Sequence, residues 1–114
     1  MQIVVYDIET LLECFLVGTY IPDKGYRSFR LTKWNNELDA SINFFNSHSD
    51  YYFVGYNNIG FDAQVIVWVY RNYESWHNLE NLEICKIISQ KAKDIIHDRN
   101  YNVFPEYRES DFSF

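Results

Sequence analysis

The chain has 114 residues, which is enough for one domain with a modest core, so we expect residues 1–114 to form a single domain. An apolar fraction of 47%, with nine Phe, ten Tyr and three Trp, suits a globular fold. The net charge of -6 argues against a broad basic surface that grips nucleic acid, although it leaves room for an active site that holds cations.

The first part of the chain predicts three β-strands. They span residues 2–9, 14–21 and 25–34, and the turn residues PDKG join the second strand to the third. Basic residues concentrate in the third strand and its turn, where DKGYRSFRLTK contains a single acid. This stretch is either a solvated hairpin arm or an edge that follows the phosphates of a nucleic acid. Its basic residues are Lys24, Arg27, Arg30 and Lys33.

The rest of the chain alternates between helix and strand. Asn35 or Asn36 can cap a helix over residues 36–46, and residues 51–56 predict a strand. Residues 61–73 have the Val and Ile content of a strand but the length of a helix, and we expect a helix. An amphipathic helix is predicted over residues 78–97, followed by a tail without clear periodicity. This order indicates an α/β domain with a mixed sheet flanked by helices.

The sequence also suggests where the protein resides. No run of 18 apolar residues is present and the N-terminus has no basic segment before an apolar one, so we expect neither a membrane span nor a signal peptide. We therefore expect a cytoplasmic protein. Cys14 and Cys85 lie far apart without a CxxC pair, so a disulfide or zinc framework is not expected.

Two carboxylates interrupt the apolar run VVYDIET in the first strand. Side chains at positions i and i+2 of a strand lie on one face, roughly 7 Å apart, so Asp7 and Glu9 point the same way. Two such carboxylates repel each other unless a cation sits between them, and their oxygens suit Mg²⁺ or Mn²⁺. The simpler interpretation places both acids on the solvent face of an edge strand, and a lone DxE pattern is weak support for a metal site.

A second stretch, VGYNNIGFDAQVI, places polar residues where a strand ends and a helix begins. By itself it reads as an Asn turn followed by a helix cap at Asp62. Together, however, DIET and the later NxxxFD pattern resemble the first two motifs of the DnaQ-like (DEDD) 3'-5' exonuclease superfamily. The motif sequences are most similar to those of the proofreading exonuclease domain of family B and phage-type DNA polymerases.

The resemblance implies a ribonuclease H-like fold and a nuclease that uses two metal ions, Mg²⁺ or Mn²⁺. It assigns Asp7, Glu9 and Asp62 to catalysis and metal binding. It assigns Thr10, Asn57 and Phe61 to substrate binding. Within this interpretation, residues 1–114 are the N-terminal part of an exonuclease domain.

The third motif of that superfamily should be YxxxD or HxxxxD on a late helix. HxxxxD is absent, and YxxxD occurs only as Tyr107 and Asp111, close to the chain end and without a helical apolar face. A chance match in a chain rich in Tyr and acids explains this pair better. We therefore expect that the helix with the last ligand is missing and that the domain is incomplete at its C-terminus.

The leading hypothesis is a metal-dependent 3'-5' exonuclease of the proofreading type that acts on DNA ends. Its partners would be the 3' end of single-stranded DNA and the remainder of a DNA polymerase, in the host cytoplasm if a phage encodes it. The residues themselves leave DNA and RNA both open as substrate. The alternative is a noncatalytic exonuclease-like module that binds a protein or nucleic acid, and a third possibility is an unrelated α/β domain with coincidental acids.

Overall fold

The computed structural model describes residues 2–55 and 61–100, with only the backbone described for residues 99 and 100. The described part confirms an α/β domain with a mixed sheet flanked by helices. Its elements in chain order are β1 (Ile3–Leu11), β2 (Cys14–Ile21), β3 (Gly25–Leu31), α1 (Leu38–Ser47), β4 (Tyr52–Gly55), α2 (Ala63–Asn72), the 3-10 helix η2 (Tyr73–Trp76) and α3 (Asn81–Asn100).

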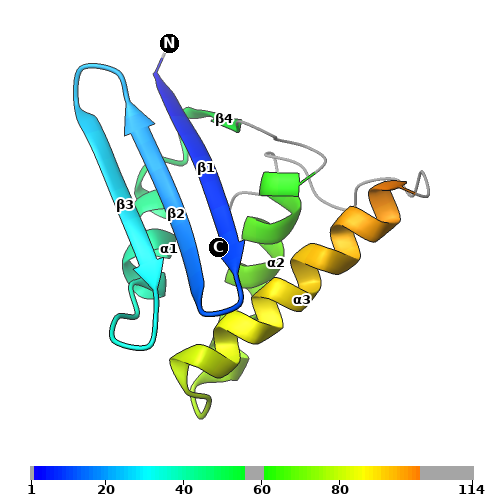
Figure 1. Ribbon diagram of the computed structural model, residues 1–114. Helices are drawn as coiled ribbons and strands as arrows, with labels where there is room; N and C mark the ends of the chain where they lie inside the picture. Colours follow the sequence, from blue (N-terminus) through cyan, green and yellow to red (C-terminus); the bar gives the residue numbers. More distant parts are fainter. Residues whose placement is uncertain (1, 56–60, 101–114) are drawn as a thin grey trace.

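The four described strands form one sheet in the order β3-β2-β1-β4 (Figure 1). The first three strands are antiparallel neighbours, joined by short turns, whereas β4 runs parallel to β1. A parallel neighbour requires a crossover connection, and α1 supplies it between β3 and β4. Strand β1 is therefore central, with a partner on each side.

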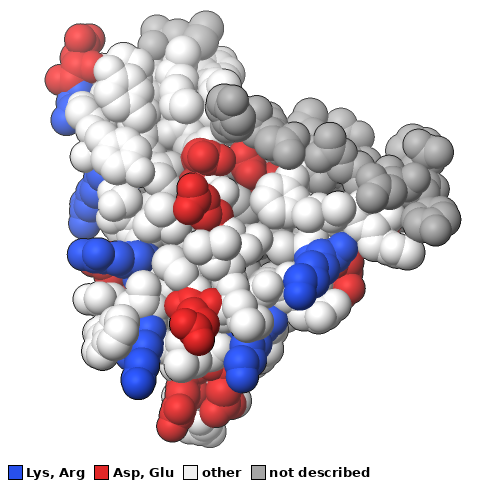
Figure 2. Space-filling model, viewed as in Figure 1, with Lys and Arg blue, Asp and Glu red and all other residues white. Residues whose placement is uncertain are grey.

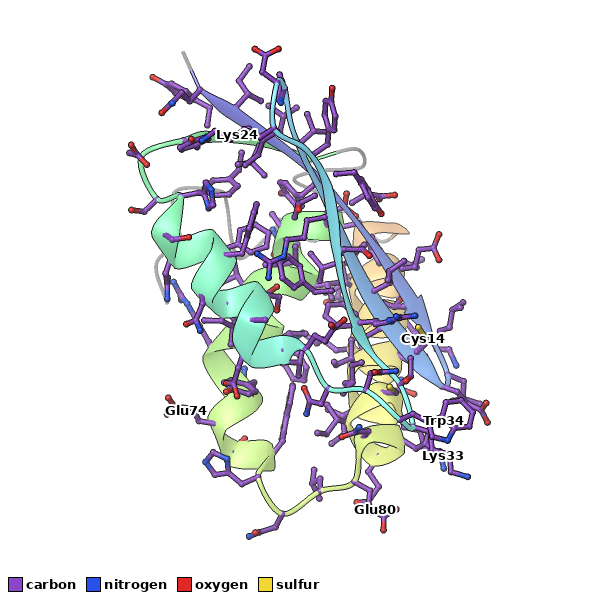
Figure 3. The ribbon with its side chains drawn as sticks, turned by 90° about the vertical axis from the view of Figure 1, so that its left-hand side faces the viewer. Cys14, Lys24, Lys33, Trp34, Glu74 and Glu80 are labelled. Carbon is purple, nitrogen blue, oxygen red and sulfur yellow. The ribbon has the colours of Figure 1, made fainter. Side chains whose placement is uncertain are left out.

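All described helices lie on one side of this sheet (Figure 3). Strand β1 shows why, because its side chains alternate between apolar and polar or exposed positions. Val4, Tyr6 and Ile8 are buried against the helices, while Asp7 and Glu9 on the opposite face are exposed. We call the two surfaces the covered face and the open face of the sheet.

Aromatic residues fill the core beneath the covered face. Phe45 of α1 is fully buried and stacks on Phe53 of β4 with the ring centroids 5.2 Å apart. Tyr6 meets Phe45 edge-on at 6.0 Å, and Tyr70 of α2 lies 5.6 Å from the same ring. Such contacts contribute beyond the burial of apolar area, so Phe45 joins β1, β4 and α2 into one core.

The boundaries of β3 and α1 differ from those predicted. Strand β3 ends at Leu31 and not at residue 34, because the Thr32 hydroxyl oxygen accepts hydrogen bonds from the backbone N–H groups of Trp34 (3.2 Å) and Asn35 (3.1 Å) and turns the chain. Helix α1 begins at Leu38. Asn36 still serves its start, since its side-chain oxygen accepts a hydrogen bond of 3.1 Å from the Leu38 N–H.

The two later helices are confirmed with shifted ends. The ambiguous segment is helical as α2 and continues into η2, and seven of the ten residues of α2 are buried, which explains its strand-like apolar content. Helix α3 starts at Asn81, whose side-chain amide donates a 2.8 Å hydrogen bond to the Thr32 carbonyl. Within residues 2–55 and 61–100, no helix has the length and apolarity needed to cross a membrane.

Candidate functional site

The two acids of the DIET stretch lie at the centre of the open face. Asp7 is paired in register with Gly18 of β2, and Glu9 is paired with Leu16. Both carboxylates are exposed, and strand geometry places the two side chains roughly 7 Å apart along β1. The sequence-based expectation that they share one face holds in the fold.

Neither carboxylate is neutralised by a nearby cationic side chain. In the described part of the chain, Asp7 and Glu9 form no ion pair and accept no side-chain hydrogen bond. Figure 2 shows acidic side chains in the middle of this face over β1, with Lys and Arg along the β3 margin and over α3. The oxygens of both acids are thus available to a ligand from solution.

The second predicted stretch begins beside these acids. Strand β4 ends at Gly55, whose register partner on β1 is Tyr6, directly before Asp7. The parallel pairing therefore delivers the chain to the level of Asp7 as it leaves the sheet toward α2. The supporting residue Asn57 lies outside the described residues.

Phe61 and Asp62 mark the start of α2. Phe61 is half-buried and packs against the core. Asp62 occupies the N-cap position with only 1% of its surface exposed, but its side chain does not cap the helix. Asp62 therefore lies at the expected N-cap position without a side-chain cap bond, and a buried carboxylate at this position requires compensation by other groups.

The described residues do not assemble a ready-made metal centre. In residues 2–55 and 61–100, no group of three or more His, Cys, Asp or Glu side chains is placed to hold a metal ion. Asp7 and Glu9 are brought together on the open face, but they do not form such a group with Asp62. A cation on this face would be held by the β1 pair and by water or substrate oxygens.

Of the other predicted site residues, only Thr10 can be compared with the acids. Thr10 is half-buried, and strand alternation directs it to the covered face, opposite Asp7 and Glu9. Tyr107 and Asp111, the weak match to a third motif, lie outside the described residues.

The basic stretch around β3 is engaged mainly in local contacts. The Lys24 ammonium group donates a 3.0 Å hydrogen bond to the Tyr51 hydroxyl, and this bond raises the pKa of Lys24. The Arg27 guanidinium lies 4.8 Å from the ring centre of Phe29. Arg30 lies 3.9 Å from a Glu37 carboxylate oxygen. These exposed contacts are those of a solvated edge. Of the four basic residues in this stretch, strand alternation places Arg30 alone on the open face.

Sequence reasoning missed the aromatic residues next to the acids. Tyr20 and Tyr26 are register partners on β2 and β3, and both are exposed on the open face. The alternation in CFLVGTYI and GYRSFRL could have found them, because each tyrosine is out of phase with the buried residues Val17 and Phe29.

The chain was compared with known protein families, curated proteins and solved structures. The sequence matches no protein-family model, and no curated protein or solved structure was found to be similar to the chain.

Proposed function

We propose that this chain carries a metal-dependent 3'-5' exonuclease site whose β1 carboxylates, Asp7 and Glu9, bind Mg²⁺ or Mn²⁺. The observation that carries the proposal is the placement of two exposed acids, without a cationic protein partner in the described residues, at the centre of an open sheet face. Carboxylate oxygens are the ligands these hard cations prefer. The mixed sheet is compatible with the ribonuclease H-like fold that the resemblance implies.

The residues of the chain have distinct roles in this proposal. Asp7 and Glu9 hold the cation and, through it, the phosphate to be cut. A bound divalent ion supplies a nucleophile at neutral pH by lowering the pKa of its water, and it offsets charge on the leaving oxygen. Asp62 is buried at the start of α2 and forms no ligand group with Asp7 and Glu9 among the described residues, so the proposal gives it no direct contact with the cation. DNA is the proposed substrate, with a free 3' end.

A noncatalytic module is the second candidate, and one observation favours it. The described residues contain no group of three ligands, whereas a nuclease with two ions requires several. An exonuclease-like domain that binds its partner without cutting needs fewer ligands. The two candidates therefore differ in cleavage, while both allow Asp7 and Glu9 to bind a cation.

The test combines metal binding with cleavage. Mn²⁺ should raise the melting temperature of the wild-type chain, because a ligand that binds only the folded state adds about 2.7 kcal/mol at 100 times its Kd. Asp7→Asn should abolish the shift, whereas Asp94→Asn, a control at an exposed acid of α3, should retain it. An equal shift in Asp7→Asn would refute the metal site.

Cleavage is measured on a single strand labelled at its 3' or 5' end. An exonuclease releases the 3' label as a mononucleotide and shortens the 5'-labelled strand stepwise, and Asp7→Asn should stop both. We expect slow release, because a mechanism with two ions requires several ligands and the described residues contain no group of three His, Cys, Asp or Glu placed to hold a metal ion. A Mn²⁺ shift at Asp7 without any release would favour the noncatalytic module.

A further inference from the structure

An uncharged patch crosses the open face beside the acids. One register row joins Val54 of β4, Val5 of β1, Tyr20 of β2 and Tyr26 of β3. Their exposed fractions are 46%, 38%, 46% and 67%. We call these four residues the tyrosine patch. Exposed apolar side chains that are contiguous across a sheet mark a binding surface more often than scattered ones do.

The tyrosine patch adjoins the acids without a side chain between them. The next register row contains Asp7, Gly18 and Ser28. Gly18 has no side chain, and the Tyr26 hydroxyl occupies that space, 2.7 Å from where a Cβ on Gly18 would lie. The ring of Tyr26 therefore leans over β2 toward the strand that carries Asp7, and the surface from the patch to the carboxylate is continuous.

A positive charge flanks the same surface. Glu9, Leu16 and Arg30 form the following register row, so Arg30 lies on the open face two strands from Glu9. Neighbouring strands are about 4.8 Å apart, which separates the backbones of these two residues by about 10 Å. The Arg30 side chain is 60% exposed. The open face thus combines exposed aromatic rings, an exposed guanidinium that lies 3.9 Å from Glu37 and a pair of exposed acids.

From this arrangement we infer that the tyrosine patch is a stacking platform for unpaired bases of a single-stranded nucleic acid whose phosphate is held at Asp7 and Glu9. Tyr20 and Tyr26 would offer their rings to one or two bases, and Arg30 would contact a neighbouring phosphate. Proteins bind single strands by this combination of aromatic stacking and positive charge. The inference rests on the proposed function, because Asp7 and Glu9 repel phosphates unless they hold a cation.

A protein partner fits this face less well. An apolar protein surface laid over the tyrosine patch would also cover Asp7 and Glu9 and would remove water from two carboxylates that have no cationic partner in the described residues. A single strand brings phosphates and their cations, and it leaves the acids in contact with water.

The test is binding of a fluorescein-labelled dT12 oligonucleotide to the full chain, followed by anisotropy in Ca²⁺, which occupies oxygen sites. The double variant Tyr20→Ala, Tyr26→Ala should raise the Kd about 5- to 150-fold, the range for the loss of one stacked base. Tyr20→Phe, Tyr26→Phe keeps both rings and should bind within about twofold of wild type. Trp34→Ala removes another exposed aromatic ring, at the far end of β3 from Lys24 (Figure 3), and should leave the Kd unchanged.

A matched change in the ligand isolates the bases. An oligonucleotide of the same length and charge with abasic sites should bind the wild-type chain as weakly as dT12 binds the Tyr20→Ala, Tyr26→Ala variant. Equal binding of dT12 and the abasic strand, or equal Kd values for wild type and the double variant, would overturn the platform. Wild type that does not bind dT12 would also overturn it and would point to a protein partner for this face.

The outcome separates this inference from the proposed function. Melting curves of Tyr20→Ala, Tyr26→Ala show whether the variant folds and whether Mn²⁺ still stabilises it. A retained Mn²⁺ shift with unchanged dT12 binding refutes the platform and leaves the metal site intact. A wild-type chain without any Mn²⁺ shift refutes the proposed function, and with it the assignment of the phosphate to Asp7 and Glu9.

Discussion

The covered and open faces of the sheet are made by the same strands but differ in burial and in polarity. On β1 the neighbours Val4 and Val5 are 0% and 38% exposed, and the two acids follow Val5 on its own face. Because successive side chains alternate, each residue of β1 serves either the core or the surface. The difference teaches that stability and chemistry can be changed separately in this strand.

An open face is not by itself a functional site. Sheets with antiparallel strands often pack one face and leave the other in water. What distinguishes this sheet is that the central strand, rather than an edge, carries two acids without a cationic partner in the described residues. Like charges on one strand face are unfavourable for folding, and the proposed cation would offset this repulsion.

The largest effect on stability should come from Tyr6 on the covered face, and Tyr20 on the open face serves as its comparison. Tyr6→Ala should lower the free energy of unfolding by about 3 to 5 kcal/mol, because it opens a cavity beside Phe45 and Phe53. Tyr20→Ala, on the open face, should change it by less than about 1 kcal/mol. Urea denaturation followed by circular dichroism measures both. Equal losses would mean that the open face is packed against something in solution.

Two glycines in the β2-β3 hairpin should separate steric from conformational cost. Gly25 has φ of +99° and free space around it, so Gly25→Ala should cost about 1 to 2 kcal/mol through backbone strain alone. Gly18→Ala meets only the end of the Tyr26 side chain, which can swing outward, so its cost should stay below about 1 kcal/mol. Gly18→Ala should nevertheless weaken dT12 binding, since it displaces Tyr26 from the tyrosine patch.

These glycine variants also need folding and binding measured side by side. Thermal melting gives the stability change, and anisotropy gives the Kd on the same samples. A Gly18→Ala chain that loses more stability than Gly25→Ala would show that the Tyr26 ring is held in place on the open face.

Much of this fold followed from residue patterns, because alternation and helical periodicity report burial directly. The strands and helices were predicted as types, including α2, whose strand-like Val and Ile content reflects burial on several sides. The errors lie where side chains override the pattern. Thr32 stops β3 by accepting backbone hydrogen bonds, and no propensity argument contained that turn.

The candidate site was only half predictable. The shared face of Asp7 and Glu9 follows from strand geometry, whereas the position of Asp62 depends on how the chain leaves β4. Tyr20 and Tyr26 come together through cross-strand register, which three strands must fix jointly. Contacts between distant segments of this kind cannot be read from periodicity within one segment.

A smaller effect on stability should come from the contact between α3 and the turn after β3. The Asn81 side-chain amide donates to the Thr32 carbonyl at 2.8 Å, so it ties α3 to the turn after β3. Asn81→Ala should lower the free energy of unfolding by about 1 kcal/mol, the usual net value of one such bond. Asn78→Ala, an exposed asparagine in the preceding turn, should change it by less than about 0.5 kcal/mol. Equal values in urea denaturation would show that the Asn81 bond adds nothing.

The smallest effect should come from the two thiols, which repeat the contrast between covered and exposed positions. Cys85 of α3 is buried under the sheet, whereas Cys14 at the start of β2 is partly exposed. Burial raises the pKa of Cys85 from 9.0 to about 11, and the nearby Cys14 adds to the shift. At pH 8 a thiol reagent should therefore modify Cys14 quickly and Cys85 only as the chain opens.

The raised pKa of Cys85 also predicts how stability depends on pH. Below about pH 9 the folded and unfolded chains both keep the Cys85 proton, so this thiol adds no pH dependence. Between about pH 9 and 11 the unfolded chain loses the proton first, so the free energy of unfolding must fall as the pH rises. Burial raises the pKa of Tyr70 as well, and that group adds a decline of the same sign in every variant. The measurement is therefore a difference. Cys85→Ala should flatten the decline between pH 9 and 11 in urea denaturation, whereas Cys14→Ala should preserve it, and identical slopes in the two variants would mean that Cys85 reaches solvent in the folded chain.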